Sequence, residues 1–128
     1  MKCPKCAAAM AKVEFQGVEV DRCTECLGMW FDLLEHEQLK TLSGSEVIDI
    51  GAPEVGKINN TITRIACPSC TVPLISMVVA GQPHISYEAC TVCYGVYFDA
   101  GEFKDYKEET FGEIMRALFG RAKPQTPA

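Results

Sequence analysis

Two copies of one cysteine pattern dominate this sequence. Each copy has two Cys-x-x-Cys motifs, written CPKC and CTEC in the first and CPSC and CTVC in the second. A Cys-x-x-Cys turn places two thiolates about one tetrahedral edge apart, and two such turns complete the four-sulfur coordination of structural zinc. We therefore predict two zinc ions, each held by four cysteines. The expected ligands are Cys3, Cys6, Cys23 and Cys26 in the first site and Cys67, Cys70, Cys90 and Cys93 in the second.

The match between the copies extends beyond the cysteines, so the chain contains an internal repeat. The second copy is longer by three residues, all between its cysteine pairs, where a hairpin tip tolerates insertion. The other aligned positions are Pro4 and Pro68, Thr24 and Thr91, Gly28 and Gly95, Phe31 and Phe98, Asp32 and Asp99, and Glu35 and Glu102.

Zinc would also stabilise units that are too small to fold through their apolar core alone. A unit of ~40 residues has too little core to offset its chain entropy without metal or disulfides, and zinc supplies on the order of 10 kcal/mol. Three alternatives use the same cysteines. A rubredoxin-like iron site has the same thiolates, although the glycine common after such pairs is replaced at Ala7, Leu27, Thr71 and Tyr94. A thioredoxin-like redox pair lies near a βαβ unit, which is not apparent, and disulfides imply export.

Each stretch between the cysteine pairs has the pattern of a β-hairpin. In the first copy, apolar residues alternate over 13–20 around a Gln-Gly turn whose glycine permits positive φ. In the second copy, residues 74–79 and 84–87 are the corresponding strands, joined by the longer connection 80–83. The duplication is compatible with a pseudo-twofold arrangement of the two units.

A helix is predicted to start after each hairpin. Asp32 and Asp99 fit the N-cap, and Glu35 and Glu102 fit the position from which a carboxylate reaches back to the cap amide. We interpret these four residues as capping groups, since their spacing suits a helix start better than a pair of catalytic acids. The sequence thus offers no catalytic centre here, and we expect a protein that is not an enzyme.

Aromatic residues and histidines are the other candidate functional groups. Trp30 and Tyr97 occupy equivalent positions beside a glycine, which favours ribbon cores over platforms for stacking nucleic-acid bases. His36 and His84 have no histidine counterpart in the other copy. With four cysteines available for each metal, neither histidine is needed as a ligand.

The rest of the chain divides into a connector and a C-terminal stretch. We predict a first ribbon with a short helix at 1–42, a packed connector at 43–66, a second ribbon with a helix start at 67–107, an amphipathic helix at 108–120 and a disordered tail at 121–128. The connector is expected to pack through Val47, Ile48, Ile50, Ile58, Ile62 and Ile65. The helix that starts in the second ribbon is expected to run on through 108–120, with an apolar stripe formed by Phe103, Tyr106, Phe111, Ile114, Met115, Leu118 and Phe119.

The motif CPxC, hairpin, CxxC, x-Gly-x-aromatic-Phe-Asp-x-x-Glu occurs twice, and through it the sequence resembles bacterial zinc-finger proteins grouped with the zinc ribbon of transcription factor IIB. The resemblance is carried by residues 3–6, 23–35, 67–70 and 90–102. It implies zinc and a ribbon fold, and the family name implies a link to transcription. The sequence departs from the usual pattern at Leu27 and Tyr94, where glycine is typical, and at Tyr97, where tryptophan is typical.

These patterns predict a small metal-bound α+β protein: two tandem zinc ribbons, each a β-hairpin with a short helix, followed by a C-terminal amphipathic helix. We expect a noncatalytic, cytoplasmic module with two Zn²⁺ that mediates protein-protein contacts. The net charge of −5 argues against unspecific attraction to nucleic acid, whose direct binding is the alternative function. A thiol oxidoreductase is a third hypothesis. No apolar run is long enough to span a membrane.

Overall fold

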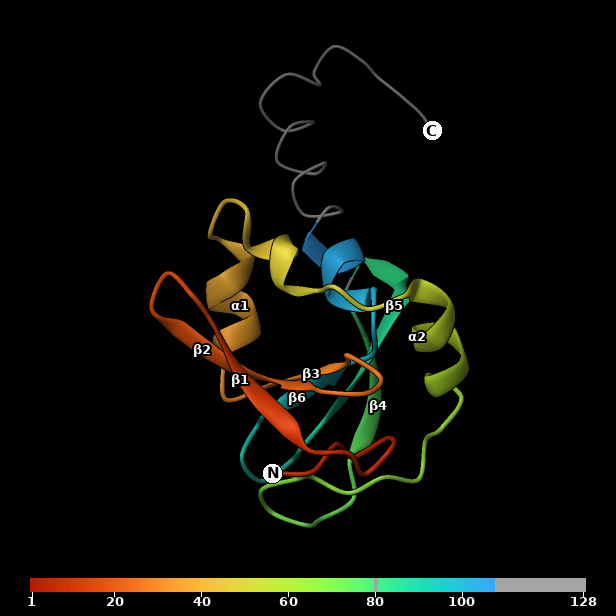
Figure 1. Ribbon diagram of the computed structural model, residues 1–128. Helices are drawn as coiled ribbons and strands as arrows, with labels where there is room; N and C mark the ends of the chain where they lie inside the picture. The colour runs from red at the N-terminus through yellow and green to blue at the C-terminus, as the bar shows by residue number, and fades with distance from the viewer. Residues whose placement is uncertain (80, 108–128) are drawn as a thin grey trace.

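The computed structural model describes residues 1–79 and 81–107, which form one six-stranded sheet with short helices beside it (Figure 1). The strand order is β1-β2-β3-β6-β5-β4, and every neighbouring pair is antiparallel. The predicted helix at 108–120 and tail at 121–128 lie outside the described residues. The elements are β1 (Met10–Phe15), β2 (Val18–Cys23), β3 (Met29–Phe31), α1 (Glu35–Lys40), the 3₁₀ helix η1 (Ser45–Ile48), α2 (Pro53–Asn59), β4 (Ile75–Val79), β5 (Gln82–Ala89) and β6 (Val96–Phe98).

Both predicted hairpins are present. In the first, β1 and β2 meet at Gln16 and Gly17, whose φ values of 50° and 88° are those of the tight turn that the Gln-Gly sequence predicts. In the second, β5 begins at Gln82, two residues earlier than expected, so the connection is shorter than predicted. The β4–β5 register shifts between Val78 and Val79, and this irregularity accommodates the insertion.

The two repeats join edge to edge through β3 and β6, around a pseudo-twofold axis. The register is symmetric about Trp30 and Tyr97, which lie opposite each other. Each of these side chains crosses to the glycine of the other repeat: a Cβ at Gly28 would overlap the Tyr97 hydroxyl, and a Cβ at Gly95 would overlap the Trp30 ring. The flanking pairs are Met29 with Phe98 and Phe31 with Val96.

Two buried clusters lie along this junction. The larger one contains stacked and edge-on aromatic rings, with Phe31 and Phe98 at a centroid distance of 5.6 Å. The smaller one surrounds buried cysteines of both repeats and includes Trp30 and Tyr97. Because both clusters draw on the two repeats, the ribbons share their core.

The first predicted helix start differs from expectation. Helix α1 begins at Glu35, after Leu34 in a left-handed conformation with φ 63°. The Asp32 N–H donates to Glu35 Oε1 at 2.9 Å, so the expected backward reach of the glutamate is confirmed. The Asp32 carboxylate instead accepts a hydrogen bond from Trp30 Nε1 at 3.2 Å, and its assignment as an N-cap is wrong.

The second helix start is capped from the connector. Residues 102–107 are helical, and the Asp49 carboxylate accepts hydrogen bonds from the N–H groups of Gly101 and Lys104, both at 2.9 Å. Asp99 therefore does not cap this helix, and its assignment as an N-cap is wrong. Glu102 accepts from the Ser86 N–H at 3.3 Å, so the glutamate contacts β5 instead of reaching back. Asp49, which is distant in the sequence, thus caps this helix in place of the nearby Asp99.

The connector lies partly buried against the ribbons. Ile48 and Ile65 are buried, and Gly56 packs so closely on the Ala100 carbonyl that a Cβ would overlap it. The remaining aliphatic residues of the expected core set are exposed: Val47, Ile50, Ile58 and Ile62. None of the described helices is long and apolar enough to cross a membrane.

Candidate metal centres

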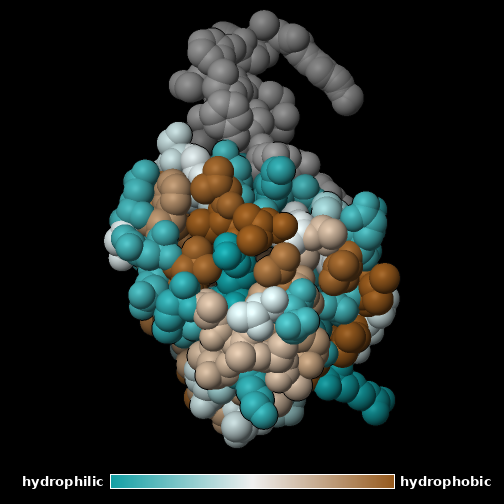
Figure 2. Space-filling view, in the orientation of Figure 1, coloured by the Kyte–Doolittle hydropathy of each residue, from teal (hydrophilic) through white to brown (hydrophobic). Residues whose placement is uncertain are grey.

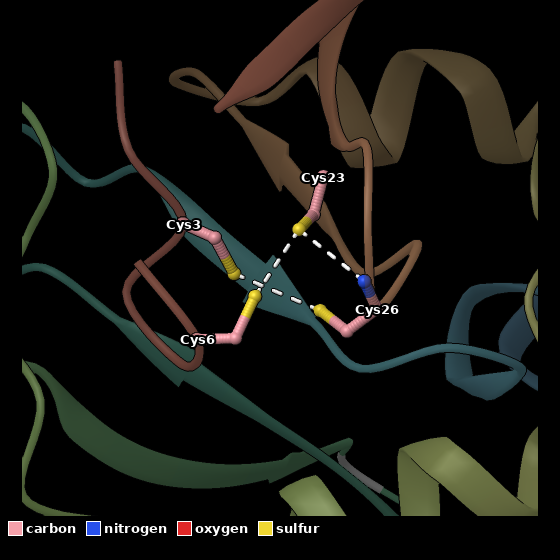
Figure 3. A group of neighbouring side chains, drawn as sticks. All are labelled: Cys3, Cys6, Cys23 and Cys26. Atoms are coloured by element: carbon pink, nitrogen blue, oxygen red, sulfur yellow. Dashed lines mark hydrogen bonds between the residues drawn. The ribbon is translucent and has the colours of Figure 1, made fainter. Parts of the chain in front are cut away.

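The four cysteines of each repeat converge as the sequence predicts. In the first cluster, Cys3 and Cys6 come from the N-terminal turn, Cys23 from the end of β2 and Cys26 from the turn before β3; their sulfurs point toward a common centre (Figure 3). Within each cluster all four Sγ atoms lie within 4.8 Å of one another. The second cluster comprises Cys67, Cys70, Cys90 and Cys93.

The sulfur separations fit zinc. Cys3 and Cys26 lie 3.7 Å apart, and Cys6 and Cys23 lie 3.4 Å apart. A tetrahedral ion with Zn–S bonds of about 2.3 Å has S···S edges of about 3.8 Å. All eight cysteines are free thiols. The donor set and its geometry therefore suit two four-cysteine zinc sites.

Backbone amides within the turns direct hydrogen bonds at the sulfurs. In the first cluster, the N–H groups of Glu25 and Cys26 donate to Cys23 Sγ, both at 3.4 Å. In the second, the Cys70 N–H donates to Cys67 Sγ at 3.2 Å. Such bonds spread the negative charge of a thiolate and fix the direction of its lone pairs. Each turn thus prepares its sulfurs for a cation.

The residue after each cysteine pair adopts the left-handed conformation that favours glycine. The φ values are 67° at Ala7, 64° at Leu27, 63° at Thr71 and 62° at Tyr94. Glycine would adopt this conformation without a Cβ clash, whereas other residues carry about 1 to 2 kcal/mol of strain. The residues that replace the usual glycine therefore keep the same left-handed turn, at the cost of this strain.

Hydrogen bonds among the thiols shift their pKa values in the absence of metal. The Cys3 thiol donates to Cys26, which lowers the pKa of Cys26 to about 4 and raises the pKa of Cys3. Burial opposes ionisation of Cys90, but the N–H groups of Cys93 and Val92 outweigh it and lower the pKa of Cys90 to about 7. Each cluster thus contains a thiol predisposed to bind metal as thiolate.

Tyr97 of the second ribbon completes the surroundings of the first cluster. Its hydroxyl lies 3.2 Å from Cys3 Sγ and 3.4 Å from Cys26 Sγ. With zinc bound, the thiolates would carry no proton, so the single hydroxyl proton of Tyr97 would be shared between the two sulfurs. Burial raises the pKa of Tyr97, which keeps this proton in place. At the equivalent position, Trp30 donates its indole N–H to Asp32 and not to a sulfur.

Tyr97→Phe is expected to weaken the first zinc site selectively. The change removes a hydroxyl donor to two sulfurs while keeping the ring, and loss of such a contact typically lowers metal affinity about 10- to 100-fold. Competition with a chromophoric chelator should resolve one weakened and one unchanged zinc ion, so the second site is an internal control. Equal weakening of both ions would show that the change acts through general stability.

A buried ion-pair cluster links the first metal turn to the second ribbon. Lys5 Nζ lies 3.1 Å from Asp99 Oδ2 and 3.4 Å from Glu88 Oε1, and it donates to the Asn59 carbonyl at 2.7 Å. At most 2% of each of the three charged side chains is exposed. Burial raises the pKa of Asp99 and that of Glu88, the latter to about 7, although the Lys5 ammonium opposes both shifts. Sequence reasoning missed this cluster because its partners lie far apart in the chain.

His36 belongs to the aromatic core and not to a metal site. Its ring lies 6.0 Å from that of Phe98 and 6.1 Å from that of Tyr106. Burial lowers the pKa of His36, which favours the neutral ring. The aligned residue of the second repeat, Phe103, is buried in the same cluster. The prediction that zinc binding does not need His36 agrees with this packing.

The fold and the two clusters define a tandem zinc-ribbon protein. The family model for the transcription factor zinc-finger, the zinc ribbon of transcription factor IIB, matches residues 2–41 and 66–109. The chain therefore belongs to this family, with one copy in each matched segment. No curated protein and no solved structure matches the chain. Zinc is the metal implied by both the family and the sulfur geometry.

Proposed function

We propose that the chain is a noncatalytic zinc-binding module that contacts other proteins through its connector. The observation that carries this proposal is the exposure of large apolar side chains there: Val47, Ile50 and Ile58 are 64%, 56% and 67% exposed. Figure 2 shows hydrophobic surface over η1 and α2. Apolar patches on a folded surface commonly mark interaction sites. The family description supports a partner that acts in transcription.

Direct nucleic-acid binding has less support. Trp30 and Tyr97 are fully buried, so neither ring is available for stacking on bases. Several basic groups are also engaged within the protein: Lys5 in the buried ion-pair cluster, Lys107 with Glu46, and the Arg22 guanidinium with a backbone carbonyl. An acidic protein with several of its cations engaged internally has less to offer a phosphate backbone.

Titration of labelled single- and double-stranded DNA and RNA with the zinc-loaded protein tests the choice. We expect no binding, even at low salt. In parallel, the wild-type protein is expected to recover a partner that the double variant Val47→Ser, Ile58→Ser does not recover, because both side chains are mostly exposed and contribute little to folding. Micromolar binding of nucleic acid with a steep salt dependence would replace the protein-contact proposal.

A further inference from the structure

The pseudo-twofold axis allows the two sides of the molecule to be compared residue by residue. It relates Leu27 to Tyr94, Leu33 to Ala100 and Leu34 to Gly101. The backbone obeys this relation, since Leu27 and Tyr94 have φ values of 64° and 62°, and Leu34 and Gly101 are both left-handed. A surface that is covered on one side therefore has a defined counterpart on the other.

The connector covers one of these two surfaces. Gly51 packs against Ala100 and Leu27, with Leu27 Cβ at 3.0 Å from where a Gly51 Cβ would lie. Pro53 lies against Gly101, whose added Cβ would be 3.2 Å from the Pro53 Cα. Ala100 and Gly101 are buried as a result. Small residues of the connector thus seal this side.

The related surface on the other side is exposed and more apolar. Leu33, Leu34 and Tyr94 are 56%, 52% and 62% exposed. In Figure 1, α1, which follows the leucines, lies on the opposite side of the molecule from α2 of the connector. Leu34 also keeps a left-handed conformation that costs about 1 to 2 kcal/mol in a residue other than glycine. We call Leu33, Leu34 and Tyr94 the uncovered surface.

Charge distinguishes the two sides as well. Asp99 is ion-paired with Lys5, whereas its counterpart Asp32 is exposed and forms no ion pair among the described residues. The second copy has Ser69 where the first copy has Lys5. No ammonium equivalent to that of Lys5 therefore reaches Asp32. The uncovered surface is therefore bordered by an exposed carboxylate that forms no direct ion pair among the described residues, although the Lys12 ammonium also acts on it electrostatically.

We propose that the uncovered surface docks a segment of a partner protein that places small apolar residues on Leu33, Leu34 and Tyr94 and a lysine or arginine beside Asp32. The proposal rests on the protein-contact function proposed above and adds a second contact surface to it, with a partner segment of stated chemistry. The apolar part follows from the connector, whose small residues cover the related surface. The basic part follows from charge complementarity with Asp32. Its residues differ from the exposed connector side chains Val47, Ile50 and Ile58.

Selection of peptides from a random displayed library on the zinc-loaded protein tests the proposal. Enriched peptides are expected to carry a basic residue next to glycine, alanine, proline or valine. Their affinity should fall about tenfold or more in the double variant Leu33→Ser, Tyr94→Ser, because the change removes an aromatic anchor, the kind of residue that dominates interface affinity, together with its apolar neighbour. Asp32→Asn keeps an acceptor for the Trp30 indole but removes the charge, so it should reduce the salt dependence of peptide binding. The control Glu54→Gln in α2 removes a charge elsewhere and should leave the salt dependence unchanged. Zinc content and circular dichroism report whether the variants fold.

The outcomes separate this proposal from the function on which it rests. Peptides lost with Val47→Ser, Ile58→Ser but retained by Leu33→Ser, Tyr94→Ser would overturn the uncovered surface and leave the protein-contact function standing. A dimer in sedimentation that Tyr94→Ser dissociates would assign the surface to a second copy and overturn the proposal. Failure to enrich any peptide would overturn it too, and tight nucleic-acid binding would overturn both.

Discussion

Removal of zinc by a chelator is expected to unfold the protein as a whole. Zinc supplies on the order of 10 kcal/mol to a structural site, which matches the total stability of about 5 to 15 kcal/mol of most domains. Buried cysteines of both sites share one cluster with Trp30, Ile65, Leu74 and Tyr97; they are Cys3, Cys23, Cys67 and Cys90. Without metal, the packing around Trp30 should be lost, and the near-ultraviolet circular dichroism should collapse.

Loss of a single site should spread across the β3–β6 junction. Cys67→Ser removes one ligand of the second site, and we expect the first zinc ion to be released more easily as well, because Tyr97 bridges the ribbons. Zinc stoichiometry and unfolding midpoints, measured against wild type, check this result. A metal-free protein with native near-ultraviolet signal, or a variant whose first site is unaffected, would contradict the shared core.

Lys5→Met is expected to destabilise the zinc-loaded protein by about 3 to 5 kcal/mol, because it leaves Asp99 and Glu88 buried without a cation. Both carboxyl groups already have raised pKa values. Loss of the ammonium raises both pKa values further. A carboxyl group whose pKa is higher in the folded than in the unfolded protein lowers the free energy of unfolding as pH rises toward the folded-state pKa. The deficit should therefore be larger at pH 8 than at pH 6, as measured by urea unfolding.

Lys12→Met is the matched control. Lys12 lies 3.0 Å from Asp21, yet 59% of its side chain is exposed. Ion pairs of that kind contribute about 1 kcal/mol or less, so this variant should lose far less stability. Similar losses from both substitutions would mean that burial of the Lys5 cluster has little energetic consequence.

Much of the fold followed from local sequence patterns. The cysteine turns and the first hairpin depend on residues close in the chain, and the internal repeat can be read directly by aligning the two copies, so the sequence pattern alone predicted them. The repeat was compatible with a pseudo-twofold arrangement but did not predict that β3 pairs with β6, because the sequence of an apolar strand does not specify which strand it pairs with. The exposed connector side chains were mistaken for core since hydrophobicity alone does not give depth of burial.

The missed features all depend on contacts between distant residues. Asp99 looks like Asp32 in sequence, yet one pairs with Lys5 and the other with Trp30. The true cap of the second helix, Asp49, lies in the connector and has no capping motif. Tyr97 appears in sequence as a conservative aromatic change, and only the fold brings its hydroxyl to Cys3.

The symmetric register of β3 and β6 is the one that two identical chains would adopt in a homodimer. When both halves belong to one chain, their association is intramolecular, and each half experiences the other at an effective concentration of about millimolar for flexible linkers. The halves then need not remain identical to stay together. Lys5 and Ser69, or Trp30 and Tyr97, can differ because each occurs once per molecule. A covalent dimer of this kind can use one face for its own connector and keep the related face for another protein.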